Sequence, residues 1–162
     1  MLSAEQLEIR LATPDDAAVI ATVLLDSFAE FKSLYTEKGF LATTLNERQI
    51  LARMREGPVW VALREGVILG TFAIVLEGQS AYIRGMAVLP SARGGGVGSA
   101  LLKHVESWAV GAGCVRLFLS TTPFLSAAIG LYERLGFQRV EEGPHELFDT
   151  PLLTMEKHLL SN

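Results

Sequence analysis

The chain contains a single cysteine, Cys114, and no apolar run long enough to cross a membrane. One cysteine excludes a disulfide within the chain and a cysteine-rich zinc site. The longest apolar segments stay below the ~18 residues that predict a transmembrane helix. The first residues, "MLSAEQLEIR", carry neither the basic start nor the apolar stretch of a secretory signal. We therefore expect a cytoplasmic protein without a membrane partner.

Positive charge is also scarce, because 14 lysines and arginines stand against 18 aspartates and glutamates and leave a net charge of −4. Nucleic-acid binding needs an excess of positive charge, so we expect no nucleic-acid partner. The three histidines do not stand at metal-ligand spacings, and we expect no metal site. A small anionic ligand is still compatible with this composition, because one loop can carry a local positive field.

The chain shows no internal repeat, low-complexity tract or linker. Its 162 residues, 49% of them hydrophobic, suffice for one domain with a full core and exclude disorder. We therefore expect a single domain over residues 1–162.

Hydrophobic periodicity predicts an α/β fold with a mixed sheet. Strand patterns cover 7–12, 59–63, 67–75, 81–89, 114–121, 137–140 and 152–159, and helical patterns cover about 14–30, a segment from Thr44, 98–110 and a segment after Thr122-Pro123. Thr13-Pro14 and the capping box Thr44-Leu-Asn-Glu47 predict two of the helix starts. The second, third and fourth strands predict an antiparallel meander. The strand, loop, helix and strand that follow predict a parallel, right-handed crossover.

The segment "LPSARGGGVGSALL", residues 89–102, joins the meander to a helix and holds four glycines in the five positions 94–98. Amides at the start of a helix have no intrahelical partner, and the helix dipole is positive there, so anions bind at such ends. Glycines let an anion approach the backbone, and Arg93 adds a guanidinium that can pair with two phosphate oxygens. The loop therefore predicts a site for a phosphate or pyrophosphate.

The spacing of this loop separates three kinds of phosphate site. A Walker loop requires Lys-Ser/Thr after its last glycine, but Gly98 is followed by Ser99 and Ala100. A dinucleotide loop would place Ser99 or Leu101 at its third glycine, and no acidic residue stands about 20 residues later in the following strand. The third pattern, Arg/Gln-x-x-Gly-x-Gly/Ala, fits Arg93 through Gly98.

That third pattern is similar to the pyrophosphate loop of the GCN5-related N-acetyltransferase (GNAT) superfamily. Three further segments resemble the same family in the expected order: "IRLATPDDAAVI" its opening, "AAIGLYERLGF" its second signature and "LTMEKHL" its final strand. The resemblance spans nearly the whole chain. It implies a mixed, mostly antiparallel sheet of six to seven strands, with helices on both faces and splayed central strands. Homodimers are common in the family.

The resemblance also implies an enzyme that transfers the acetyl group of acetyl-CoA directly to a primary amine of a small molecule or peptide. Tyr132, the tyrosine of the second signature, would give the leaving thiolate its proton. A backbone amide near Ala87 or Val88 would polarise the thioester carbonyl. The residues implied for acetyl-CoA are Met86, Ala87 and Val88 for the pantetheine arm and Arg93, Gly94, Gly95, Gly96, Val97, Gly98 and Ser99 for the pyrophosphate.

Two positions depart from the family pattern. Leu125 stands where an asparagine often helps to hold the cofactor arm, and Tyr82 stands where many members have a glutamate that acts as general base. The alternatives for the base are Glu77, Glu30, ordered water and an amine with a lowered pKa. These departures keep open a second hypothesis, a non-catalytic acyl-CoA-binding module that serves as a sensor or interaction partner.

The sequence does not identify the acceptor amine. In the family, the segment after the first helix usually forms one wall of the acceptor site, and here that segment contains Phe31, Tyr35 and Phe40. Core packing explains these aromatic residues equally well. The segment has no acidic cluster for a polycation, which favours a small or moderately apolar amine over a histone-like tail.

Overall fold

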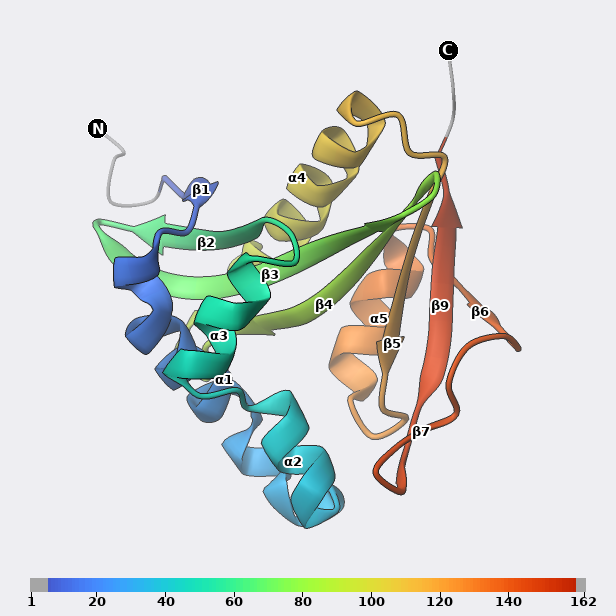
Figure 1. The fold of residues 1–162 in the computed structure, drawn as a ribbon, viewed down its shortest axis with the longest axis horizontal. Coiled ribbons are helices and arrows are strands. Elements are labelled where there is room, and N and C mark those ends of the chain that lie inside the picture. The colour runs from blue at the N-terminus through green and yellow to red at the C-terminus, as the bar shows by residue number, and fades with distance from the viewer. Residues whose placement is uncertain (1–5, 160–162) are drawn as a thin grey trace.

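The computed structural model describes residues 6–159 and contains a seven-stranded sheet in the order β1-β2-β3-β4-β5-β9-β6 (Figure 1). The strands are β1 (Glu8–Leu11), β2 (Val59–Arg64), β3 (Val67–Glu77), β4 (Ser80–Val88), β5 (Arg116–Thr121), β6 (Gln138–Val140) and β9 (Leu153–His158). β4 and β5 run parallel, and every other neighbouring pair in this sheet is antiparallel. The predicted mixed, mostly antiparallel sheet is confirmed.

Helices cover both faces of the sheet, as predicted. They are α1 (Ala17–Phe28), α2 (Glu37–Thr43), α3 (Glu47–Met54), α4 (Val97–Gly111) and α5 (Ser126–Arg134). On one face, Ile20 of α1 and Ile50 of α3 are buried against β2 and β3. On the other face, Leu101 of α4 and Tyr132 of α5 belong to the larger core. None of the helices within residues 6–159 is both long and apolar enough to span a membrane.

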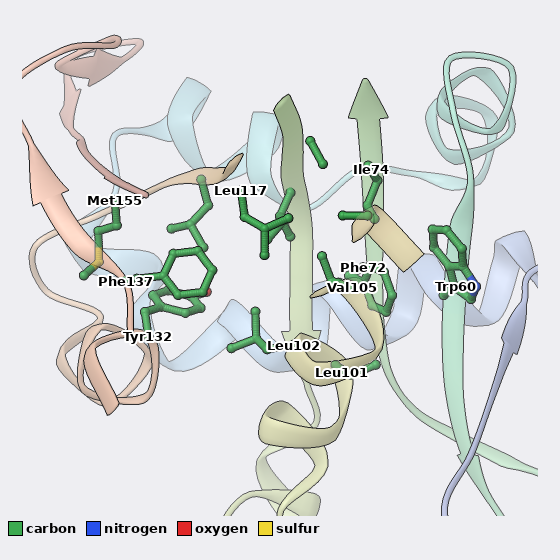
Figure 2. Close-up of a cluster of buried hydrophobic side chains, with 14 of the residues drawn as sticks. Trp60, Phe72, Ile74, Leu101, Leu102, Val105, Leu117, Tyr132, Phe137 and Met155 are labelled. Atoms are coloured by element: carbon green, nitrogen blue, oxygen red, sulfur yellow. The ribbon is translucent and has the colours of Figure 1, made fainter. Parts of the chain in front are cut away.

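The two cores draw alternate side chains from the same strand. In β2, Trp60 enters the core under α4 and α5, whereas Val61 enters the core under α1 and α3, because successive side chains of a strand point to opposite faces. Figure 2 shows Trp60 and Phe72 at one end of the larger core and Tyr132 at the other. Burying a large apolar side chain contributes about 1.5–3 kcal/mol, so this core fixes where α5 lies on the sheet.

The helix predicted for residues 14–30 is α-helical only in its middle, and 3-10 turns flank that part. Residues Pro14–Asp16 and Ala29–Leu34 are 3-10 turns that flank α1. The start lies where Thr13 predicted it, and the Thr13 amide donates to Asp16 Oδ2 at 2.8 Å. The predicted boundaries therefore hold roughly, but the α-helical part is shorter.

The predicted start of the next helix at Thr44 is wrong. Thr44 ends α2, a helix that the sequence pattern missed, and its hydroxyl donates to the Phe40 carbonyl at 2.7 Å. Asn46 caps α3 instead, with its Oδ1 accepting from the Gln49 amide at 2.9 Å and Gln49 Oε1 accepting from the Asn46 amide. The capping box is real, but it lies two residues further along because Thr44 is already used by the preceding helix.

Two further details differ near the C-terminal half. Thr122 does not cap α5, whose N-cap is Leu125. A short hairpin of β7 (Glu146–Leu147) and β8 (Thr150–Pro151) was not predicted. Its strands are too short to leave an alternating pattern in the sequence.

The central strands β4 and β5 separate part-way along their length, as the family resemblance implied. Their pairing ends at Ile83 and Leu119, and beyond this point the two ribbons diverge (Figure 1). β4 also carries a bulge, because Thr71 and Ala73 of β3 pair with Ala87 and Arg84, leaving one extra residue in β4. Gly85 lies in this bulge with a φ of +64°, a conformation that favours glycine.

Candidate functional site

A cavity of about 790 Å³ lies between the diverging parts of β4 and β5. Most of its wall comes from residues 82–88 of β4, the glycine loop at 92–99, residues 119–128 leading into α5, and the aromatic segment around Tyr35. Arg53 of α3, residues of α5 that include Tyr132, and Leu147 and Leu152 complete it. A volume of this size is typical of small-molecule sites. The sequence-predicted residues of β4 and of the loop, with the exception of Gly95, thus line one cavity together with Tyr132.

The glycine loop offers a run of free backbone donors. The Arg93 amide donates to the Pro90 carbonyl, and the next amide with an acceptor in the described chain is Ala100, which donates to Gly96 at 3.0 Å. The amides of residues 94–99 therefore have no protein acceptor among residues 6–159. They stand at the N-terminus of the 15-residue helix α4, where the dipole adds positive potential.

The glycines of the loop have two different roles. Gly94 and Gly96 both have a φ of +83°, and a Cβ at either position would meet nothing within 4 Å, so they shape an open turn. A Cβ at Gly98, by contrast, would lie 2.8 Å from a methyl group of Leu131. Gly98 therefore allows Leu131 of α5 to pack closely against the start of α4.

Arg93 is turned from the loop towards α1. Its guanidinium pairs with the Glu30 carboxylate and donates to the Ser27 carbonyl at 2.7 Å. The Arg93 side chain is still 38% exposed, and the residue lines the cavity beside Gly94. The cation predicted for a phosphate thus lies in the cavity wall, where it is held against α1.

The edge of β4 that faces β5 has no partner strand beyond Ile83. Met86, Ala87 and Val88 lie on this stretch and line the cavity, while Ala87 and Val88 pair with β3 on the other edge. Backbone groups on such a free edge can bind an extended ligand as a neighbouring strand would. This is the geometry expected for the residues implied to hold the pantetheine arm.

Tyr132 of α5 lines the cavity and also belongs to the larger core. The residue is 7% exposed, and its ring packs against Phe137 with the centroids 5.8 Å apart (Figure 2). No hydrogen bond of its hydroxyl is made within residues 6–159. Burial, with a smaller contribution from Tyr35, raises the pKa of Tyr132 to about 12, so the phenol keeps its proton at neutral pH.

Aromatic side chains form a second wall. Tyr35 packs edge-to-face on Phe124 with the ring centroids 4.9 Å apart, and Phe31 lies 6.3 Å from Phe124. Tyr35 and Phe31 line the cavity, whereas Phe40 packs behind Tyr35, 5.8 Å from its centroid. Of the three aromatic residues predicted for the acceptor wall, two therefore face the cavity, and Phe40 supports them.

This wall is tied to the β7–β8 hairpin by hydrogen bonds that the sequence did not predict. The buried Thr150 hydroxyl accepts from the Thr36 amide at 3.0 Å, and the Thr36 hydroxyl donates to the Phe148 carbonyl at 2.7 Å. Residues more than a hundred positions apart thus fix the start of α2. No local pattern around Thr36 or Thr150 signals this contact.

No acidic side chain and no histidine within residues 6–159 lines the cavity. Glu30 pairs with Arg93 outside it, and Glu77 is exposed at the end of β3. Tyr82, which stands at the expected glutamate position, lines the cavity and stacks on Phe118 with centroids 5.0 Å apart. The described part of the chain also contains no cluster of three or more metal-ligating side chains.

Comparison with known proteins connects this geometry to a family. The model of the Acetyltransferase (GNAT) family matches residues 21–137. The chain belongs to the GNAT family of N-acetyltransferases. The matched region contains both the glycine loop and "AAIGLYERLGF", so the resemblance drawn from these segments is confirmed.

Several GNAT proteins are similar to this chain. The uncharacterized N-acetyltransferase YjgM of Escherichia coli (strain K12) is 31% identical over 82% of this chain and 83% of that protein. An IAA acetyltransferase of Azospirillum brasilense is 37% identical over 61% of this chain and 66% of its own length, just under two thirds. The structure of the PaiA N-acetyltransferase of Thermoplasma acidophilum in complex with coenzyme A matches with a TM-score of 0.82, 16% identity and coverage of 94% and 99% of the two chains, which is a likeness of fold.

Proposed function

We propose that this GNAT protein transfers the acetyl group of acetyl-CoA to a primary amine of a small molecule. The observation that carries the proposal is the single cavity that joins three elements: the free amides of residues 94–99, the free edge of β4 and the Tyr132 hydroxyl. A relative named as an IAA acetyltransferase supports a small-molecule acceptor.

The residues present fit acetyl-CoA. The amides of residues 94–99, the helix dipole and Arg93 provide donors for a pyrophosphate, and Gly94 and Gly96 leave the space beside them free of side chains. The free edge at Met86–Val88 provides donors and acceptors for the amide groups of a pantetheine arm. When bound, acetyl-CoA supplies the activated acetyl thioester.

Two groups of the chain act at the reacting end of the cavity. The backbone N–H of Val88 stabilises negative charge on an acyl oxygen, since the Leu89 amide donates to β3 and the amide before it points to the free edge. A preorganised donor of this kind is worth far more in a buried site than in water. The Tyr132 hydroxyl holds a proton for the leaving sulfur, because its raised pKa keeps the phenol protonated. Leu125 lies at the N-cap of α5, where a family asparagine would add a polar contact, and here it contributes an apolar one.

The chain supplies no side-chain base to the cavity within its described residues. The amine must therefore lose its proton to water, and the arginines of the cavity wall favour this loss because positive charge disfavours the ammonium form. We infer that the acceptor enters or becomes neutral without a carboxylate partner from the protein.

The proposal is tested by mixing the protein with acetyl-CoA and a broad amine panel and following free thiol. We expect thiol release well above hydrolysis for at least one amine, together with stabilisation of the protein by acetyl-CoA. Stabilisation without any amine-dependent release would instead support the non-catalytic acyl-CoA-binding module that the departures at Tyr82 and Leu125 keep open.

A further inference from the structure

Arg53 places a guanidinium in the wall of the cavity. It belongs to the last turn of α3 and lines the cavity beside Tyr82 and Gly85. A Cβ at Gly85 would lie 2.5 Å from Arg53 Nη1, so the guanidinium lies in the space beside Gly85 and would have to shift for a larger residue there. The bulge of β4 and the arginine of α3 therefore fit each other.

Within residues 6–159, no carboxylate forms an ion pair with Arg53, although its neighbour Arg84 pairs with Glu56. Burial, with a smaller contribution from Arg84, lowers the pKa of Arg53 to about 10, which leaves it charged at neutral pH. Burying a charge without a partner is costly. Glu56, which pairs with Arg84, adds a weaker attraction without forming an ion pair with Arg53, so the partly buried guanidinium can still pair with an anion that enters the cavity.

The order of residues along β4 locates this charge. The glycine loop lies beyond the C-terminal end of β4, Met86–Val88 come next, and Gly85 and Tyr82 lie further back along the strand. An extended strand advances about 3.3 Å per residue, so Gly85 is about 10 Å from Val88 along the strand. Arg53 therefore faces the part of the cavity past the proposed arm site, on the side away from Arg93.

We propose that Arg53 binds an acid group of the acceptor, so that the acceptor is an amine that carries a carboxylate in the same molecule, as an amino acid does. The proposal rests on the proposed function, because it names the class of its second substrate. A guanidinium binds a carboxylate through two parallel hydrogen bonds. The same charge, together with Arg84, repels polyamines and other acceptors that have only positive groups.

The experiment compares each of the proteinogenic L-amino acids with its carboxamide, which keeps the amine and side chain and removes the negative charge. One readout is kcat/KM for thiol release from acetyl-CoA, and the other is the Tm shift of protein saturated with coenzyme A. The variants are R53M, R53K and the control R55M, since Arg55 is exposed at the end of the same helix. The amine of a carboxamide loses its proton more readily than that of the acid, so a preference for the acid cannot come from amine reactivity.

In the wild type and in R55M, we expect at least one acid to exceed its carboxamide by about tenfold or more, as for a hydrogen bond between charged groups. R53M should lose this preference and keep its Tm shift with coenzyme A, and R53K should recover part of the preference. Three results would overturn the proposal: carboxamides equal or better than all acids in the wild type, an unchanged preference in R53M, or loss of coenzyme A stabilisation in R53M, which would assign Arg53 to the phosphates of the coenzyme.

The two readouts separate this proposal from the proposed activity. If no compound releases thiol but acids raise Tm only when Arg53 is present, the acid site stands and the transferase activity fails. If neutral amines are acetylated and no acid is preferred in either readout, the activity stands and the acid site fails.

Discussion

Arg93, the first residue of the glycine loop, donates a hydrogen bond to the main-chain carbonyl of Ser27 on α1 across 2.7 Å. The same guanidinium also pairs with the Glu30 carboxylate. Arg93 thus holds the loop to α1, and in the proposed function the same guanidinium also binds a phosphate of the coenzyme.

Replacing Glu30 with glutamine should strengthen coenzyme A binding by about 2–5-fold, because the change releases Arg93 and removes a negative charge near the phosphates. R93M should weaken binding by about tenfold. Calorimetric titration with coenzyme A measures both, and D26N on exposed α1 surface controls for the change in net charge. Weaker binding in E30Q would mean that Glu30 positions Arg93 for the phosphate.

Replacing Gly96 with valine should abolish stabilisation by acetyl-CoA while the protein still folds. The φ of +83° makes a β-branched residue cost about 1–2 kcal/mol there, and its side chain would project from the surface that is proposed to receive the pyrophosphate. G66V is the matched control, because Gly66 has a φ of +79°, an equally open surrounding and a place in the β2–β3 turn. Thermal shift with acetyl-CoA should be lost only in G96V; an unchanged shift in G96V would refute the assigned loop.

Replacing Tyr132 with phenylalanine should lower kcat by about tenfold or more, with near-normal affinity for coenzyme A. Folding stability should change little, since the hydroxyl makes no hydrogen bond within the described residues. Y82F removes a hydroxyl from the same cavity and should keep kcat within about threefold. Full activity in Y132F would show that another group protonates the sulfur.

The pH profile should reflect the acceptor rather than the protein. With no carboxylate or histidine in the described cavity wall, log kcat/KM should rise with unit slope up to the pKa of the acceptor amine, and two acceptors should give two different inflections. The raised pKa of Tyr132, about 12, means that this proton donor is lost only as pH rises through that value, so Tyr132 gives no falling limb below about pH 10. For an acceptor with a carboxylate, a fall in kcat/KM near pH 10 is expected from Arg53, whose pKa is about 10. An inflection that stays constant across acceptors would reveal a protein base.

Replacing Thr150 with valine should lower the free energy of unfolding by about 1–3 kcal/mol, because the buried hydroxyl bonds to Thr36 of the α2 start. It should also raise KM for the acceptor, since α2 supports the aromatic wall. T154V is the comparison: the Thr154 hydroxyl is buried and has no hydrogen-bond partner among residues 6–159, so its removal should be neutral or stabilising. Urea unfolding and acceptor KM measure the difference, and equal effects of the two variants would contradict the role given to Thr150.

Local signals in the sequence predicted the parts of the site that depend on local geometry. The closely spaced glycines between Arg93 and Gly98 predict a loop with exposed backbone amides. The apolar periodicity that follows predicts that a helix begins directly after this loop. Part of the larger core could also be predicted, because Trp60 lies in an apolar strand pattern and Leu101 and Val105 lie on the apolar face of a helical pattern. These features depend on neighbours within a few residues, which a single sequence displays directly.

The rest depends on contacts between distant segments. No pattern in the sequence singles out Arg53, because its place against Gly85 follows from the bulge in β4. Thr44 was misread as a helix start because α2, a short helix with one turn of apolar pattern, was invisible to periodicity. The pairing of Arg93 with Glu30 joins residues that no spacing rule connects.

The most direct test of the account is a single-turnover time course with the protein in excess over acetyl-CoA and in the presence of an amine acceptor. The account predicts that free thiol and acetylated amine appear together in equal amounts, far faster than acetyl-CoA hydrolysis, while the mass of the protein stays unchanged. Thiol release that remains at the hydrolysis rate, in protein that acetyl-CoA nevertheless stabilises against heat, would contradict the proposed transfer.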